Sequence, residues 1–141
     1  MKSVKVGDYM ATRLVTFHRN DNVVSAMGLL LDKKISGAPV VDDAGNLVGI
    51  LSEVDLLEII VQDSYYDESM GIVADYMQPE VDTVDAHMDI YALAERFLKE
   101  HRRRFPVVDN GRLVGQISRR DVLRAAQDFL MHPERNKRRS T

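Results

Sequence analysis

Apolar positions along the chain follow the same order twice and predict a β-α-β-β-α unit in each half. Short β-prone runs at 14–17 and 81–84 lead into polar turns, with helix N-caps expected within 20–22 and at Asp85. The apolar residues of the helices that follow fall at i, i+1, i+4, i+7 and i+8, the spacing of one helix face. They are Val23, Val24, Met27, Leu30 and Leu31 in the first half, and Ile90, Tyr91, Ala94, Phe97 and Leu98 in the second.

Each half also predicts a β-hairpin followed by a second helix. Strands at 38–41 and 47–51 flank a polar turn in the first half. Strands at 105–108 and 113–117 flank Asn110-Gly111 in the second, and Asn-Gly is the strongest short hairpin signal. The closing helices are expected at 53–62 and 119–131.

The second half is a copy of the first. Asp8-Tyr9-Met10 recurs 67 residues later, and so does the Pro-Val-Val-Asp strand that begins at Pro39. After a one-residue deletion in the hairpin turn the offset is 66, which pairs Ser52 with Ser118. An offset that persists across nearly the whole chain indicates an internal duplication.

This register divides the chain into four parts. Repeat 1 with its lead-in is expected at 1–63 and repeat 2 at 71–131, joined by an acidic linker at 64–70. The basic tail at 132–141 has no apolar stripe and is expected to be disordered. One repeat alone has a thin sheet and two helices to bury, so the two repeats are expected to share a core.

Composition excludes several classes of site. The chain has 141 residues, no cysteine and a formal net charge of −3. Without cysteine there are no disulfides, thiolate metal sites or cysteine nucleophiles, and the net charge gives no general attraction to nucleic acid. No apolar run reaches the roughly 20 residues of a membrane helix, and the N-terminus lacks the apolar segment of a secretory signal. We therefore expect a cytoplasmic protein that does not insert into a membrane.

A Gly-x-x-Ser-x-x-Asp run precedes the last helix of each copy, at 49–55 and 115–121. A helix N-terminus stabilises a phosphate group, and a serine there can donate a further hydrogen bond. An aspartate three residues later can accept hydrogen bonds from ribose hydroxyls. Gly49 and Gly115 would let a ligand approach the strand end. Ser-x-x-Asp is also close to a helix capping box, which needs no ligand, so this alternative stays open.

These matched features resemble the CBS (cystathionine-β-synthase-type) domain family in its paired arrangement, the Bateman module. The resemblance covers roughly 4–130 and rests on the lead-in, the Pro-Val-Val-Asp strand and the Gly-x-x-Ser-x-x-Asp run of both copies. It implies an α/β (α+β) fold of two tandem β-α-β-β-α repeats packed as a pseudo-twofold pair. It also implies an adenine nucleotide (AMP, ADP or ATP) as a regulatory ligand, with no cofactor required.

Charge distinguishes the two implied ligand sites. Glu53 follows the serine of copy one and would repel phosphate, whereas Arg119 and Arg120 follow the serine of copy two, near a basic loop at 101–104. A solvated arginine face, strand-forming threonines and a core Phe105 are the alternatives. From the resemblance, the predicted contacts are Ser118, Asp121, Arg119, Arg120, Thr83, Arg104, Phe105 and Pro106 in copy two, with Ser52, Asp55, Thr16 and Ala38 in copy one.

The closing helix of copy one predicts self-association. Residues 56–61 are apolar on more than one helix face, and a monomer needs only one such face. The resemblance implies a dimer through these helices, and a symmetric homodimer is expected. The alternative is that the extra apolar side chains face the other repeat of the same chain.

Other functional classes fit the sequence less well. Four scattered histidines lack metal-ligand spacing, and there is no Gly-x-Ser-x-Gly elbow or P-loop, so no enzyme activity is expected. The basic runs at 102–104 and 137–139 lack interleaved aromatic residues, so no nucleic acid is expected as a partner. The sequence thus predicts a regulatory adenine-nucleotide sensor acting through an unknown effector protein. A nucleotide-independent dimeric interaction module with vestigial sites is the alternative.

Overall fold

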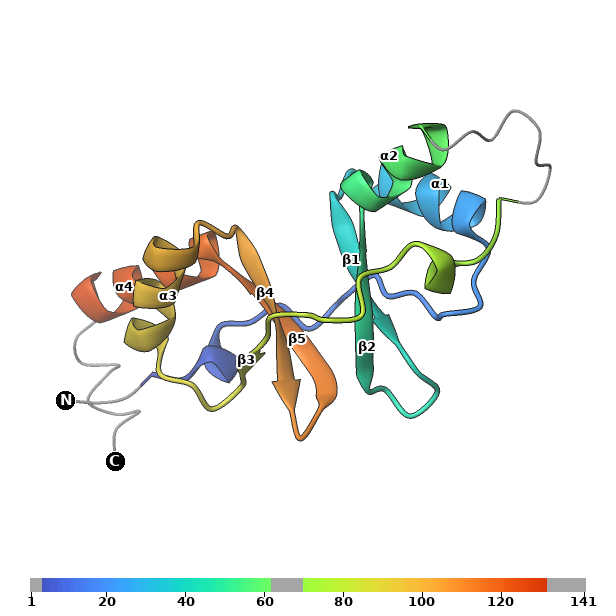
Figure 1. Ribbon diagram of the computed structural model, residues 1–141. Coiled ribbons are helices and arrows are strands. Elements are labelled where there is room, and N and C mark those ends of the chain that lie inside the picture. Colours follow the sequence, from blue (N-terminus) through green and yellow to red (C-terminus); the bar gives the residue numbers. More distant parts are fainter. Residues whose placement is uncertain (1–3, 62–69, 132–141) are drawn as a thin grey trace. The chain divides into compact units, whose positions relative to one another are not determined.

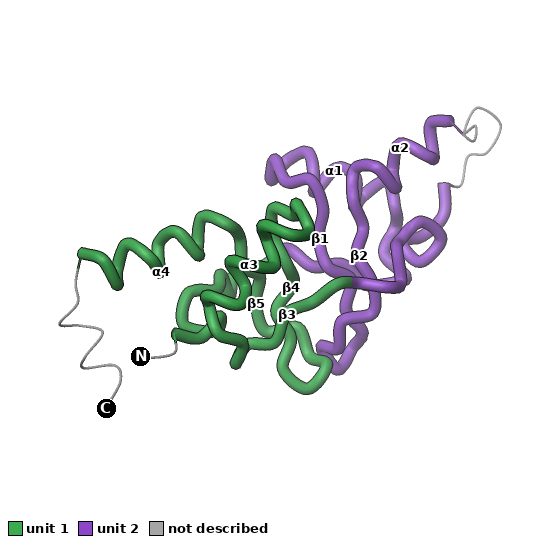
Figure 2. The backbone as a smooth tube through the Cα atoms, turned by 60° about the vertical axis from the view of Figure 1, so that its left-hand side comes forward, with its two compact units in different colours: residues 1–14, 82–141 green, residues 15–81 purple. Residues whose placement is uncertain are grey.

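The computed structural model describes residues 4–61 and 70–131 and divides the chain into two compact units (Figure 2). Unit 1 combines 1–14 with 82–141, and unit 2 is 15–81. The boundaries of these units differ from those of the repeats predicted at 1–63 and 71–131. The segment at the start of each repeat, its lead-in, packs with the other repeat. The predicted linker, Met70 apart, and the predicted tail lie outside the described residues.

Unit 2 is an antiparallel hairpin with two helices at the end opposite its turn (Figure 1). Its core joins Phe17, side chains of both helices and strands, and Val73 from the lead-in of repeat 2. In chain order its elements are α1 (Val23–Lys33), β1 (Gly37–Val41), β2 (Leu47–Ser52), α2 (Glu53–Val61) and the 3₁₀ turn η2 (Val73–Asp75).

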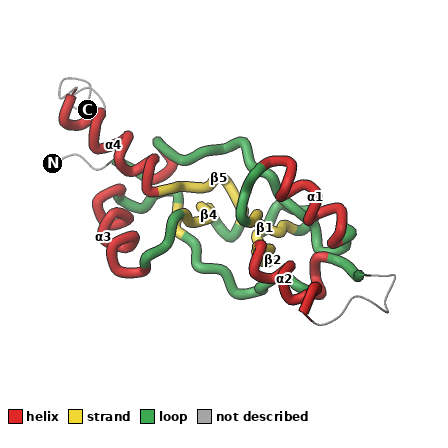
Figure 3. The backbone as a smooth tube through the Cα atoms, turned by 90° about the horizontal axis from the view of Figure 1, so that it is seen from above, coloured by secondary structure: helices red, strands yellow, loops and turns green. Residues whose placement is uncertain are grey.

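Unit 1 has the same plan with one more short strand. Its sheet order is β3-β4-β5, with β3 parallel to β4 and β4 antiparallel to β5. α3 and α4 contact each other beside this sheet (Figure 3). The elements are the 3₁₀ turn η1 (Val6–Asp8), β3 (Val84–Asp85), α3 (Ile90–Glu100), β4 (Arg104–Asp109), β5 (Arg112–Ser118) and α4 (Arg119–Met131).

The predicted helices and hairpins are confirmed to within about two residues, but the first strands are shorter than predicted. In unit 2 the run at 14–17 forms only a single bridge, from Phe17 to Val40. In unit 1 the run predicted at 81–84 forms only the two-residue strand β3 (Val84–Asp85).

The N-cap prediction holds for one helix and is wrong for the other. Asn22 caps α1 and accepts from the N–H groups of Val24 and Ser25 at 2.9 and 3.0 Å. In unit 1 the N-cap of α3 is Asp89, not Asp85. Asp85 instead accepts from the N–H of His87 at 2.7 Å, which closes a turn before the helix.

The predicted apolar stripes were also partly wrong. The buried positions repeat at i, i+3 and i+7, and they are Val23, Ala26 and Leu30 in α1 and Ile90, Leu93 and Phe97 in α3. Val24, Leu31, Tyr91 and Leu98 are 49%, 69%, 43% and 78% exposed. The same positions are exposed in both repeats, so the wider stripe belongs to the surface of each unit and not to its core.

Gly49 and Gly115 make room for the lead-in segments, which differs from their expected role toward a ligand. A Cβ on Gly115 would lie 2.5 Å from Met10 Sδ and 2.8 Å from the main-chain oxygen of Ala11. A Cβ on Gly49 would lie 2.9 Å from the main-chain oxygen of Gln78. The lead-in main chain therefore occupies the space that each absent side chain leaves.

Replacing Gly111 should destabilise the hairpin of unit 1. Asn110 and Gly111 both have positive φ, 51° and 81°, as an Asn-Gly hairpin turn requires. Gly111→Ala is expected to lower the free energy of unfolding in urea by about 1–2 kcal/mol, because a Cβ disfavours the left-handed region. No atom lies within 4 Å of that Cβ, so the cost comes from the main chain alone. Gly111→Asn should lose less, and equal losses would contradict this explanation.

Within 4–61 and 70–131, none of the helices is both long and apolar enough to cross a membrane.

Candidate functional site

The Ser-x-x-Asp run of unit 1 lies where β5 ends and α4 begins. The main-chain N–H and the hydroxyl of Ser118 both donate to Asp121 Oδ2, at 2.8 and 3.0 Å. In return, the N–H of Asp121 donates to Ser118 Oγ at 3.3 Å. Asp121 is buried, so these contacts satisfy a carboxylate that has little access to water and also stabilise the first turn of the helix.

Unit 2 repeats this geometry where β2 ends and α2 begins. The N–H and hydroxyl of Ser52 donate to Asp55 Oδ2 at 2.8 and 2.9 Å, and the N–H of Asp55 donates to Ser52 Oγ at 3.4 Å. The capping box that the sequence left open is therefore present in both units. It uses only one oxygen of each carboxylate, so the other oxygen, Oδ1, decides whether a ligand has a place to bind.

The two units differ at this second oxygen. Asp121 Oδ1 accepts from Nη2 of Arg124 at 2.5 Å, and the side chain of that arginine is 64% exposed. Asp55 Oδ1 accepts from Nε2 of Gln78 at 3.0 Å. Two main-chain hydrogen bonds to Ile50, both 2.9 Å, hold Gln78 beside β2. Gln78 is exposed as well, and its main-chain bonds leave its side chain free to turn, so the units differ in the group that holds Oδ1: a charged guanidinium in unit 1 and a neutral amide in unit 2.

The lead-in segments create this difference. Ala11 exchanges main-chain hydrogen bonds of 2.8 and 2.9 Å with Gln116, at the position of unit 1 that Gln78 occupies in unit 2. Ala11 and Gln78 are 67 residues apart and so are equivalent in the repeat. The methyl group of Ala11 has no donor for the neighbouring carboxylate. Sequence reasoning missed both Gln78 and Arg124, since the offset shows which residues are equivalent but not which repeat a lead-in joins.

Arginines gather beside Ser118, as the sequence predicted. Arg104 lies opposite Ser118 in the pairing of β4 with β5, and Arg119 and Arg120 form the exposed start of α4. In unit 2 the residue opposite Ser52 is Gly37. Three arginines therefore lie near the Ser-x-x-Asp run of unit 1, whereas unit 2 has Glu53 after its serine and Lys34 in the loop before β1.

Three of the predicted contacts are buried. Phe105 and Ala38 are 0% and 2% exposed, and Pro106 is buried beside Phe105. The Phe105 ring packs on that of Phe97, with centroids 5.0 Å apart, and the guanidinium carbon of Arg96 lies 4.4 Å from its centroid. Phe105 and Ala38 belong to the cores of their units, which was the alternative for Phe105. A contact from any of them to a ligand stays a prediction.

Thr16 and Thr83 lie half-buried beside the first strands. Thr83 directly precedes β3, and its main-chain oxygen accepts from Nη1 of Arg96 at 2.7 Å. Thr16 directly precedes Phe17, which bridges to β1. Ligand contacts by the two hydroxyls stay predictions. Across the described residues, no three His, Asp or Glu side chains gather in a way that could hold a metal ion.

Comparison with known sequences gives several relatives. "CBS domain-containing protein CBSX2, chloroplastic" of Arabidopsis thaliana is 32% identical over 149 residues, which cover 86% of this chain and 63% of that protein. Protein MJ1426 of Methanocaldococcus jannaschii is 28% identical over 154 residues, covering 85% of this chain and 89% of that protein. The chain thus spans less than two thirds of CBSX2, and it spans 41% of a further relative, MJ1225 of the same archaeon.

Solved structures with the same fold contain adenosyl ligands. CBSX2 in complex with AMP has a TM-score of 0.76 and 35% identity, covering 89% of this chain and 98% of that one. The CBS domain pair of MJ0100 in complex with 5′-methylthioadenosine and S-adenosyl-L-methionine has a TM-score of 0.69 and 25% identity, covering 89% and 97%. The model of the CBS domain family matches residues 6–62 and again 73–128. The chain, a mixed α/β fold of two repeats, therefore belongs to the CBS domain family and carries a tandem pair of CBS domains.

Proposed function

We propose that the chain is a regulatory module that binds an adenine nucleotide in unit 1, at the start of α4. One observation carries the proposal: the buried carboxylate of Asp121 has one oxygen fixed by Ser118 and the other held only by an exposed arginine. Arg104, Arg119 and Arg120 lie around the same helix start. A ribose acceptor and a phosphate-attracting surface are thus placed side by side.

In this proposal different residues of unit 1 bind the ribose and the phosphate of the ligand. The ribose hydroxyls donate to Asp121 Oδ1 and displace the Arg124 guanidinium from it. The phosphate lies toward the N-terminus of α4, where the first-turn N–H groups and nearby arginines stabilise its charge. Asp121 Oδ2 stays with Ser118 throughout, so the helix cap is kept whether or not ligand is present.

Relatives support an adenosyl ligand. CBSX2 has been solved with AMP, and the MJ0100 pair with 5′-methylthioadenosine and S-adenosyl-L-methionine. The adenosine moiety is common to these ligands, and Asp121 would recognise its ribose part. Glu53 follows the serine of unit 2, whereas Arg119 and Arg120 follow the serine of unit 1, so we propose unit 1 as the main site.

In this proposal the regulated activity belongs to another protein, the effector. We propose a cytoplasmic, non-catalytic homodimer that presents a different surface to an effector protein when nucleotide is bound. A nucleotide-independent interaction module is the second candidate. The cap contacts favour this second candidate, because the serine and the aspartate within each run already hydrogen-bond to each other without a ligand.

Nucleotide titration of thermal unfolding tests the proposal against that second candidate. Ligand at 100 times its dissociation constant should add about 2.7 kcal/mol to the free energy of unfolding, which raises the melting temperature by a few degrees. We expect this shift with at least one of AMP, ADP and ATP, and GTP serves as the control for the base. If none of the four nucleotides raises the melting temperature, the adenine-nucleotide function is contradicted and the interaction module takes its place as the preferred function.

A further inference from the structure

The arginine that holds the second oxygen of Asp121 is a group that the proposed ligand must displace. Nη2 of Arg124 lies 2.5 Å from Asp121 Oδ1, and the two residues are three apart on α4. The side chain of the aspartate is 12% exposed and that of the arginine is 64% exposed. A hydrogen bond between charged groups is stronger than one between neutral groups. In the free protein a cation of the same helix therefore occupies the proposed ribose acceptor.

The matching position of unit 2 carries the opposite charge. The residue that corresponds to Arg124, 66 positions earlier, is Glu58. A glutamate cannot donate to a neighbouring carboxylate, and Asp55 Oδ1 accepts from the neutral amide of Gln78 instead. Competition between ribose and a charged group of the same helix is therefore a property of unit 1.

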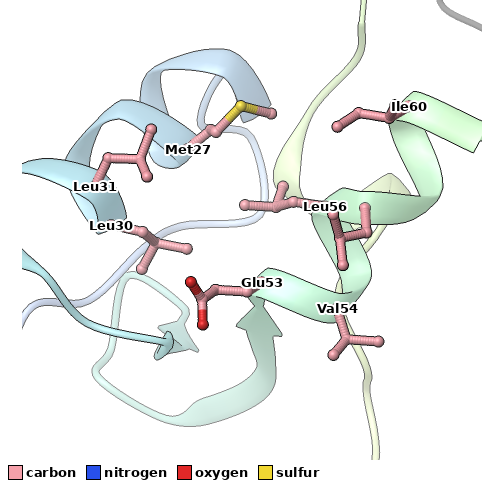
Figure 4. A pocket seen from close by; sticks show the side chains of 8 residues that line it. Met27, Leu30, Leu31, Glu53, Val54, Leu56 and Ile60 are labelled. Carbon is pink, nitrogen blue, oxygen red and sulfur yellow. The ribbon is translucent and has the colours of Figure 1, made fainter.

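The surroundings of the two helix starts differ in the same way. Glu53 and Val54 begin α2 and line a groove between α1 and α2 whose described lining is apolar apart from the glutamate (Figure 4). Arg119 and Arg120 begin α4, and both are exposed. Arg120 and Arg124 line one hollow on α4, so these two side chains, four residues apart, are neighbours. Positive charge is thus gathered around the contact with Asp121, whereas α2 contains no basic residue.

Displacement of Arg124 leaves a positive charge without its partner. Within the described residues Arg124 is paired with Asp121, whereas Arg104, Arg119 and Arg120 form no ion pair. When ribose hydroxyls take Asp121 Oδ1, the guanidinium of Arg124 loses its anion and stays near Arg120. Like charges four residues apart on a helix repel each other. A ligand with a phosphate brings an anion to this group of arginines, and an uncharged riboside does not.

We propose that Arg124 is a specificity residue, which competes with ribose for Asp121 and thereby selects phosphorylated ribosides over uncharged ones. This inference rests on the proposed function, because it requires ribose to bind Asp121. Every riboside must break the same contact, but only a nucleotide such as AMP offers the freed guanidinium a phosphate in return. Adenosine and 5′-methylthioadenosine break the contact without supplying an anion. The arginine therefore lowers the affinity for these uncharged ligands more than the affinity for AMP.

Calorimetric titration of Arg124→Ala with adenosine tests this competition, because adenosine has the ribose but no phosphate. Alanine is a good helix former, so α4 is kept at this exposed position. Loss of the arginine should raise the affinity for adenosine about 3–10-fold, between the effect of an exposed ion pair and that of a charged hydrogen bond. The affinity for AMP should rise less, because the variant also loses a cation near the phosphate. The preference for AMP over adenosine should therefore narrow.

Salt gives a second measurement, which a purely structural role of Arg124 would leave unchanged. Adenosine is uncharged, so salt affects its affinity chiefly through the ion pair that it must break. Raising NaCl from about 50 to about 500 mM screens that pair and should raise the affinity of the native chain for adenosine. In Arg124→Ala the affinity for adenosine should not change with salt.

Two control variants bracket the result. Arg124→Lys keeps the positive charge, and the contact uses a single guanidinium nitrogen, so this variant should keep the low affinity for adenosine and its dependence on salt. Arg112→Ala removes an exposed arginine at the hairpin end of β5, with the same change in net charge, and should bind adenosine as the native chain does.

The inference is overturned if Arg124→Ala binds adenosine no more tightly than the native chain. It is also overturned if adenosine fails to displace AMP from both proteins, because the arginine is then not what excludes it. Where AMP still binds the native chain through Asp121 in these cases, the proposed function stands and only the role of Arg124 is wrong. If neither ligand binds either protein, the proposed function itself is wrong, and the inference fails with it.

Discussion

Phe105→Ala is expected to lower the free energy of unfolding by about 3–5 kcal/mol, the range found when a buried phenylalanine is truncated. The Phe105 side chain is fully buried, packs on the Phe97 ring and lies under the Arg96 guanidinium. Its removal leaves a cavity in the core of unit 1 and an arginine without its aromatic neighbour. Urea unfolding followed by circular dichroism measures the loss.

Two controls separate this core role from a role in lining a base pocket. Phe105→Leu keeps most of the volume and should lose clearly less stability. Tyr91→Ala removes an aromatic ring that is 43% exposed and contacts Phe129, and it should cost less than Phe105→Ala. If Phe105→Ala kept the native stability but lost nucleotide binding, Phe105 would be a ligand contact and its assignment to the core would be wrong.

Gly115→Ala is expected to cost about 1–3 kcal/mol, because the added methyl group is forced into occupied space. It would lie 2.5 Å from Met10 Sδ and 2.8 Å from the main-chain oxygen of Ala11. The methionine side chain can move, but the main chain of Ala11 is hydrogen-bonded to Gln116 and can move only if those bonds break. Faster hydrogen exchange at the Ala11 and Gln116 amides should therefore accompany the loss.

The matched control is Gly28→Ala in α1. A Cβ on Gly28 meets nothing within 4 Å, and alanine is the better helix former, so stability should be kept or raised. Native exchange rates at Ala11 in the Gly115→Ala variant would contradict the idea that this glycine makes room for the lead-in.

The sequence predicts the elements of each repeat because their signals are local. The helix starting after Asn22 and the hairpin at Asn110-Gly111 depend on a cap residue and a turn residue, and both are visible in the order of amino acids. The family follows from the same repeated pattern. The first strands are shorter than predicted because β-prone residues do not show how many of them pair with a neighbouring strand.

The packing of the lead-in segments could not be predicted in this way. A duplicated sequence allows each lead-in to join either repeat, and both choices bury similar apolar residues such as Val6 and Val73. The contact from Gln78 to Asp55 depends on that choice, so it was missed. The serine and aspartate of each run were predicted from the duplicated motif and the resemblance, whereas their contacts with each other and the groups that hold the second carboxylate oxygen are seen only in the fold.

Isothermal titration with AMP tests the central claim, that nucleotide binds in unit 1 through Asp121. Asp121→Asn and Asp55→Asn each keep an oxygen that can accept from the capping serine but lose the negative charge. We expect about one site per chain, an affinity for AMP lowered about 10–100-fold in Asp121→Asn and an affinity within about twofold of native in Asp55→Asn. Loss of binding in Asp55→Asn with native affinity in Asp121→Asn would contradict this claim and place the site in unit 2.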